Sequence, residues 1–84
     1  MDYDVIDVKT PDHLHLQLTF RDGVSGDVFI KDSFLTGVFF DLKNPAIFST
    51  VTCKDGFVAW ENDVDLAPEV LHNQLKLSKV VELV

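Results

Sequence analysis

Residues 13–20 read H-L-H-L-Q-L-T-F, and this stretch decides how the first part of the chain folds. Apolar residues alternate strictly with more polar ones, and the apolar set is Leu14, Leu16, Leu18 and Phe20. A period of two indicates a half-buried β-strand with an apolar inner face. Ile6 and Val8 show the same period upstream, and a three-residue loop over Pro11–His13 would set them opposite Leu18 and Leu16. The segment therefore predicts an antiparallel hairpin.

The dipeptide Asp22-Gly23 predicts a second hairpin immediately downstream. A two-residue turn would place Phe20 opposite Ser25 and would point the apolar residues of the next strand away from the core. Because a buried face specifies the register strongly, we expect a three-residue loop or a bulge near Gly26 instead.

The next segment changes to a helical pattern. Leu35, Phe39 and Leu42 recur at the spacing of one helical face, so we expect a short helix over residues 36–42. Thr36 is suited to cap the start of this helix, and Asn44-Pro45 is suited to end it.

The dipeptide Asp55-Gly56 fits a two-residue type I′ turn directly. It joins a strand over residues 50–54 to a strand over residues 57–60. The turn pairs Cys53 with Val58 and Val51 with Trp60. These four residues share one face, so we expect that face, including the thiol, to be buried.

Pro68 fits the first turn of a C-terminal helix whose apolar stripe contains Val70, Leu71 and Leu75. The tail from Leu77 to Val84 is apolar and β-branched near its end, and it fits a helix continuation, an extra strand or a partner contact. We expect residues 1–84 to form a single α+β domain. Its predicted core is a small antiparallel sheet of about five short strands, with a short middle helix and a C-terminal helix.

The composition limits the classes of function. Seven basic and fourteen acidic residues give a formal net charge of −7, and such a surface repels a phosphate backbone. We therefore expect no nucleic-acid binding by this chain alone. No apolar run approaches the ~20 residues of a membrane span, and the start M-D-Y-D lacks the features of a signal peptide. We expect no membrane association and a cytoplasmic location. The lone Cys53 agrees with a reducing compartment, because a single cysteine cannot form an internal disulfide.

The residue types for catalysis and metal binding occur without a convincing arrangement. Cys53 fits a packed structural thiol better than a nucleophile, because the alternation points it inward. His13 and His15 have a spacing that can hold one metal, but the sequence offers no set of further ligands. We expect these two histidines and His72 to be solvated. Since no nucleophile elbow, phosphate loop or dinucleotide motif occurs, we expect no catalytic residues, no metal and no cofactor.

Residues 60–69, W-E-N-D-V-D-L-A-P-E, gather four carboxylates, an amide and the only tryptophan. Asp63 and Asp65 resemble part of a calcium loop, but the glycine and glutamate that must follow are absent. We expect a structural role instead, in which Asp65 caps the next helix and Asn62-Asp63 supply a left-handed turn. The candidate binding residues of this segment are Trp60, Asn62, Asp63, Asp65 and Glu69.

Three motifs in order carry a family resemblance: F-x-D-G from Phe20, G-V-F-x-x-L-x-N-P-x-x-F from Gly37, and W-x-N-x-x-D-L-A-P-E from Trp60. Together they resemble a bacterial family known as domain of unknown function 2442, over roughly Val5 to Gln74. The matching positions are Phe20, Asp22, Gly23, Gly37, Phe39, Leu42, Pro45, Phe48, Trp60, Asn62, Asp65, Ala67, Pro68 and Leu71. The family usually has proline at position 61, glycine at 63 and tyrosine at 72, where this chain has Glu61, Asp63 and His72.

The resemblance implies a small α+β domain without an established activity. Some members carry an added helix-turn-helix domain, and some are encoded beside another small protein in the style of toxin–antitoxin pairs. We therefore expect a non-enzymatic protein-interaction or regulatory module, including a place in such a two-protein system. The alternative is a small-ligand or metal-binding domain that uses the acidic segment after Trp60, and an enzyme comes third. The acidic balance and the apolar tail lead us to expect a homodimer or a complex with a basic protein.

Overall fold

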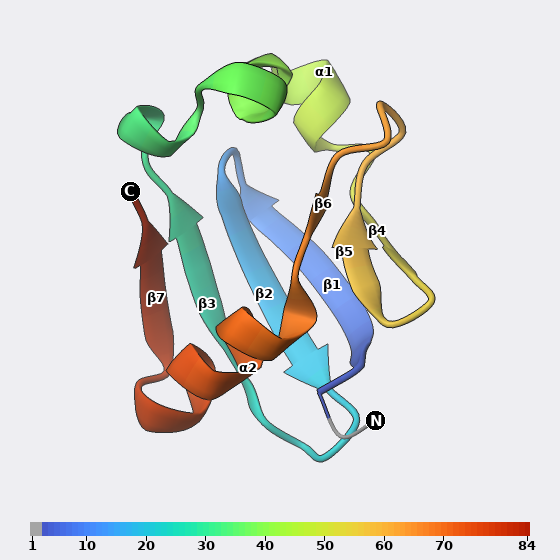
Figure 1. Ribbon diagram of the computed structural model, residues 1–84, viewed down its shortest axis with the longest axis vertical. Helices are drawn as coiled ribbons and strands as arrows, with labels where there is room; N and C mark the ends of the chain where they lie inside the picture. The colour runs from blue at the N-terminus through green and yellow to red at the C-terminus, as the bar shows by residue number, and fades with distance from the viewer. Residues whose placement is uncertain (1–2) are drawn as a thin grey trace.

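The computed structural model describes residues 3–84 and arranges them in two sheets around one core (Figure 1). In chain order the elements are β1 (Val5–Asp12), β2 (His15–Phe20), β3 (Ser25–Ile30), the 3-10 helices η1 (Asp32–Phe34) and η2 (Gly37–Lys43), α1 (Pro45–Phe48), β4 (Thr52–Lys54), β5 (Phe57–Ala59), β6 (Asp65–Leu66), α2 (Pro68–Leu77) and β7 (Val80–Leu83). One sheet has the order β1-β2-β3-β7 and the other β4-β5-β6. The α+β class is confirmed, whereas the prediction of one sheet of about five strands is wrong.

The tail explains part of this difference, because it forms a strand. β7 pairs with β3 in parallel, while the other strand pairs are antiparallel. The backbone N–H groups of Asp27 and Lys31 donate to the carbonyls of Lys79 and Leu83, at 2.9 and 2.8 Å. Parallel neighbours need a long crossover connection, and α2 supplies its last part. Of the three options for the tail, the strand is the one observed.

The β1–β2 hairpin has a different register from the predicted one. Val8 pairs with Leu18, two residues away from its predicted partner, and the turn consists of His13-Leu14. Shifts in register near both ends of β1 interrupt the period of two. As a result Val5 rather than Ile6 is buried, because the extra residue of the bulge shifts the alternation of faces by one residue between Val5 and Val8.

The β2–β3 connection has the predicted three-residue loop. The N–H of Phe20 donates to the carbonyl of Val24 at 2.8 Å, and Gly23 takes the left-handed conformation with φ 92°. Further along β3, Gly26 allows a close approach: a Cβ there would lie 2.4 Å from the Lys79 carbonyl oxygen. Leu75 of α2 and Lys79, which directly precedes β7, therefore lie against the backbone of β3.

The predicted middle helix exists in a tighter form. It is the 3-10 helix η2, and Thr36 precedes it without a side-chain capping bond. Leu42 is buried and Phe39 half-buried, as the helical spacing suggests. Asn44 ends η2 and also caps α1, because its Oδ1 accepts from the N–H of Ala46 at 3.0 Å.

The third hairpin has the predicted turn and register, but its strands are shorter than predicted. The ladder ends at Thr52 and Ala59 and does not include the predicted Val51–Trp60 pair. Cys53 pairs with Val58, and both turn residues are left-handed, with φ 53° for Asp55 and 85° for Gly56. Val58 is buried, whereas the thiol is only half-buried. Burial raises the pKa of the Cys53 thiol, and the nearby carboxylate of Asp7 adds to this effect.

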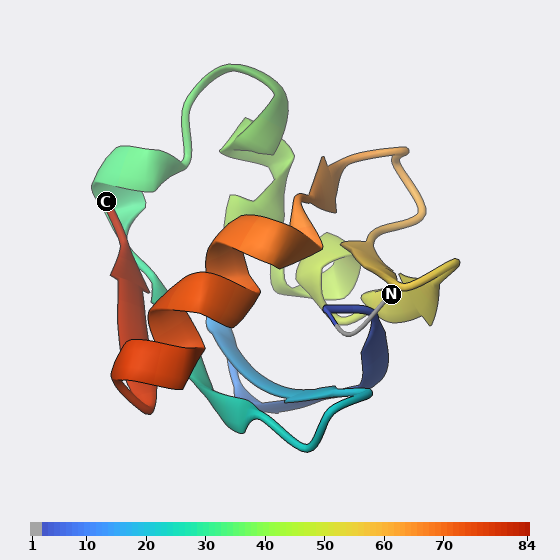
Figure 2. The same ribbon diagram turned by 60° about the horizontal axis from the view of Figure 1, so that its bottom comes forward.

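Helix α2 lies across one face of the four-stranded sheet (Figure 2). Leu71 and Leu75 point into the core, as predicted, but Val70 is exposed. The core draws on both sheets and α2, and its buried apolar residues are Val5, Leu16, Leu18, Phe20, Val28, Ile30, Leu35, Leu42, Phe48, Val58, Trp60, Val64, Leu66, Leu71, Leu75 and Val81. Over residues 3–84, none of the helices has the length and apolar character needed to cross a membrane.

Candidate functional site

The acidic segment begins in the core. The Trp60 side chain is only 3% exposed, and its Nε1 donates to the carbonyl of Phe48 at 2.9 Å. Its ring also packs against the ring of Phe48, with 5.9 Å between the centroids. Trp60 therefore anchors the segment, and the surface is formed by the residues that follow it.

These residues make a tight loop. The backbone N–H of Trp60 donates to the carbonyl of Val64 at 2.9 Å, and the N–H of Asp63 donates to the carbonyl of Trp60 at 3.1 Å. Asp63 has φ 67°, which confirms the predicted left-handed turn at this dipeptide. The side chain of Asn62 supports the turn by accepting from the Val64 N–H at 3.4 Å. The same bonding pattern occurs at the β2–β3 loop, where a glycine holds the left-handed position.

The predicted helix cap is wrong. Asp65 belongs to β6 and pairs with Ala59, so it lies two residues before Ala67, the residue at the N-cap of α2. No side-chain capping bond is made at Ala67. Pro68 occupies the first turn of α2 as expected, and Glu69 is in the same turn. Strand pairing thus fixes Asp65 in an extended conformation that points its carboxylate to the surface rather than to the helix end.

A groove of about 510 Å³ runs between η2 and the loop after Trp60. Its walls are Val38, Phe39 and Asp41 from η2, facing Asn62, Asp63, Val64 and Asp65. We call this hollow the η2 groove. None of the described residues that line it is basic, and Val38 beside it is 71% exposed. The groove therefore combines apolar surface with three carboxylates.

A smaller hollow of about 180 Å³ lies on the other side of Asp63 and Asp65. Lys54, Asp55, Phe57, Ala59 and Trp60 complete its lining. Asp63 and Asp65 thus form a ridge shared by two hollows. Of the five candidate binding residues, Asn62, Asp63 and Asp65 meet in the η2 groove, Trp60 contributes only to the smaller hollow, and Glu69 lies outside both.

The structure brings no metal ligands together within residues 3–84, since no group of three or more His, Cys, Asp or Glu side chains there could hold an ion. His13 is exposed and places Nε2 3.1 Å from the Lys43 carbonyl. His15 is half-buried, with Nε2 2.7 Å from Oδ1 of Asp27. The hydrogen bond from His15 lowers the pKa of the Asp27 carboxyl. The expectation of solvated histidines thus holds only for His13.

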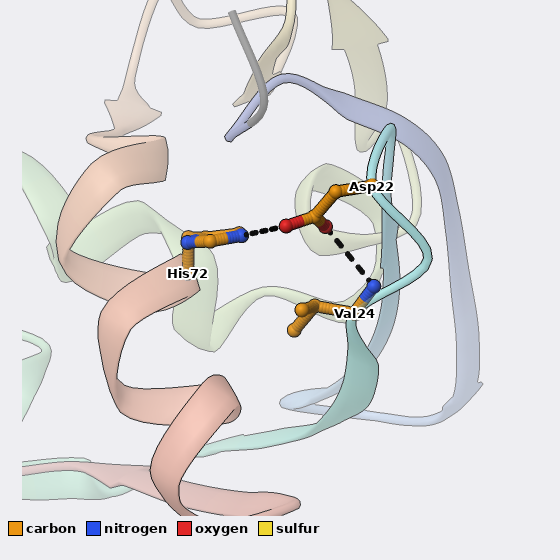
Figure 3. A network of polar contacts seen from close by, with 3 residues as sticks. All are labelled: Asp22, Val24 and His72. Carbon is orange, nitrogen blue, oxygen red and sulfur yellow. Dashed lines mark hydrogen bonds and ion pairs between the residues drawn. The ribbon is translucent and has the colours of Figure 1, made fainter.

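His72 departs furthest from that expectation. It is 9% exposed on the inner side of α2, with Nε2 2.8 Å from Oδ2 of Asp22 (Figure 3). The same carboxylate accepts from the Val24 N–H at 3.1 Å. The rings of His72 and Phe20 are nearly perpendicular, with 5.0 Å between their centroids. The hydrogen bond from His72, followed by that from Val24, lowers the pKa of the Asp22 carboxyl. One pattern in the sequence could have indicated this burial: His72 follows Pro68 by four residues, so the two lie on the same face of the helix.

The Asp22–His72 pair links α2 to the β2–β3 loop. In Figure 1 this loop is at the opposite end of the molecule from η2. The pair is therefore separate from the η2 groove. Its role is structural: it holds α2 over the sheet and gives the buried imidazole a hydrogen-bond partner.

A family model described as "Protein of unknown function (DUF2442)" matches residues 5–76. No curated protein and no solved structure matches the chain.

Proposed function

The chain belongs to the DUF2442 family of proteins of unknown function, and we propose that it serves as a cytoplasmic, non-enzymatic protein-interaction module. The η2 groove carries this proposal. Its carboxylates come from two separate segments, with Asp41 on one wall and Asp63 and Asp65 on the other. Exposed apolar surface at Val38 lies beside them. A partner segment with basic and apolar side chains is the complement of such a surface.

The charge of the whole chain supports the same partner. A net charge of −7 attracts cationic surfaces over a Debye length of about 8 Å at physiological salt, and it raises the rate of encounter more than the final affinity. The proposal includes the two-protein, toxin–antitoxin-like arrangement that the family resemblance implies for some members. In that arrangement this chain would be the acidic member, and its partner the basic one.

Binding of designed peptides tests the proposal. A peptide that alternates lysine and leucine should bind, measured by calorimetry, whereas the same peptide with glutamate in place of lysine should not. The double variant Asp63→Asn/Asp65→Asn keeps the shape of the groove, because asparagine tolerates a left-handed conformation. Each exposed charge pair contributes about 0.2–1 kcal/mol, so the loss of two should weaken binding about two- to thirtyfold.

A matched control separates the groove from the net charge. The double variant Asp12→Asn/Glu69→Gln removes the same two charges from exposed positions outside the η2 groove. It should bind the lysine–leucine peptide nearly as well as the original chain. Equal weakening in both double variants would show that only the overall charge matters, and it would contradict a site in the groove.

A small ligand is the second candidate occupant, because a volume of about 510 Å³ falls within the range of small-molecule sites. A thermal-shift screen with small metabolites and divalent metals tests this alternative. A ligand at a hundred times its dissociation constant adds about 2.7 kcal/mol to the free energy of unfolding. A stabilisation that disappears in Asp63→Asn/Asp65→Asn would favour the ligand over a protein partner.

A further inference from the structure

β7 is the outermost strand of the four-stranded sheet, and among the described strands it pairs only with β3 (Figure 1). The carbonyls of Lys79 and Leu83 accept hydrogen bonds from β3. Because the backbone groups of successive residues point to opposite sides of a strand, those of Val80 and Glu82 point away from the sheet. Such a row of outward N–H and C=O groups is a template for pairing with another strand.

Apolar side chains gather beside this edge. Within residues 3–84, eight large apolar side chains are exposed, and three of them are Leu77, Val80 and Val84. Natural edge strands are usually protected by prolines, bulges or several charges. β7 contains no proline, its register with β3 is uninterrupted, and Glu82 is its only charged residue. The edge is therefore suited to be covered by another strand.

The same edge avoids the charge repulsion that opposes self-association of an acidic chain. Residues 76–84 carry Lys76 and Lys79 against Glu82, which gives a net charge of +1 and leaves −8 for the rest of the chain. Glu82 is itself paired, with Oε2 3.0 Å from Nζ of Lys31. Two copies can thus approach through β7 without bringing unpaired carboxylates together.

We infer that the outer edge of β7 binds the same edge of a second copy of this chain in an antiparallel pair. A twofold axis at Val81 gives the best register, because Val80 of each copy then faces Glu82 of the other. Each of these two pairs exchanges two backbone hydrogen bonds. An axis at Glu82 is disfavoured, since it would set two like charges directly opposite each other. The Val80 carbonyl already accepts from Ser78 Oγ at 3.2 Å, and its second lone pair remains for the partner.

Sedimentation and light scattering at micromolar concentration test the homodimer. Glu82→Pro removes one outward N–H while sparing the bonds to β3, because proline is tolerated on an edge strand where its nitrogen faces outward. Glu82→Ala is the matched control, since it also loses the ion pair with Lys31 but keeps the N–H. The original chain and Glu82→Ala should have twice the monomer mass, and Glu82→Pro should have the monomer mass with an unchanged circular dichroism spectrum. A monomeric original chain, or a Glu82→Pro dimer, would overturn the inference.

A cross-link tests the register even if the proline variant does not fold. Val81→Cys in a Cys53→Ser background places two thiols at a non-hydrogen-bonded pair, where the Cβ atoms are close enough for a disulfide. Thr52→Cys on β4, in the same background, is the control at an exposed position. Mild oxidation of dilute protein should give a disulfide dimer only for Val81→Cys. Equal cross-linking of both variants, or none at position 81, would refute the proposed pairing.

Discussion

Replacing Trp60 by alanine tests whether this residue anchors the acidic segment in the core. The side chain is 3% exposed, and truncating a buried tryptophan costs about 3–5 kcal/mol. A domain of this size has a free energy of unfolding of about 5–15 kcal/mol. The substitution should therefore remove a large part of the stability. Trp60→Phe keeps most of the apolar volume but removes the hydrogen bond from the indole N–H to the Phe48 carbonyl. This carbonyl still accepts from the Val51 N–H at 3.2 Å, so the loss should cost only about 0.5–1.5 kcal/mol.

Urea denaturation followed by circular dichroism measures these losses, because both variants lack the only tryptophan fluorophore. Phe40→Ala is a suitable control, since this ring is exposed. Its cation–π contact, with 4.9 Å between Lys43 Nζ and the ring centroid, contributes only about 0.5–1 kcal/mol. If Trp60→Ala lowered the free energy of unfolding by less than about 1 kcal/mol, the reasoning would be refuted, because removing a buried tryptophan side chain costs more than that.

Three further predictions concern particular backbone and side-chain contacts. Asp63→Gly should stabilise the domain by about 0.5–1 kcal/mol in urea denaturation, because glycine relieves the left-handed conformation at φ 67°; a destabilised variant would contradict this. Gly26→Ala should lower the free energy of unfolding by about 1–3 kcal/mol, because its Cβ would lie 2.4 Å from the Lys79 carbonyl oxygen, and an unchanged melting curve would argue against the close contact. Asp22→Asn should make stability less sensitive to acid. The lowered pKa of Asp22 means that its ionised form stabilises the fold above the ordinary carboxyl pKa, and that this contribution is lost as the pH falls through the folded-state value. An equal acid sensitivity in the two proteins would show that the bond to His72 contributes nothing.

The local parts of the fold were predictable because short-range chemistry determines them. Asp55-Gly56 fits the type I′ turn, in which both residues are left-handed, and the hairpin register follows from it. The three-residue loop ending at Gly23 followed from the need to keep one strand face buried. Pro68 marked the start of α2 for a similarly local reason.

The remaining parts depend on contacts between distant segments. The pairing of β3 with β7 creates the four-stranded sheet, and no local pattern in the tail specifies a parallel partner. Asp65 looked like a helix cap because its pairing with Ala59 is invisible in the residues around it. The η2 groove is likewise a tertiary feature, since Asp41 and Asp63 line the same hollow although they are far apart in the sequence.

The parallel β3–β7 pair also bears on the order in which the domain folds. Residue 27 lies beside residue 80, so forming this contact closes a loop of about fifty residues, which is slow on entropic grounds. The β2–β3 and β4–β5 hairpins close much shorter loops and can form before β7 docks. A destabilising change such as Val81→Ala should then accelerate unfolding with little effect on the refolding rate. In native-state hydrogen exchange, the amides that join β7 to β3 should open more readily than those between β2 and β3.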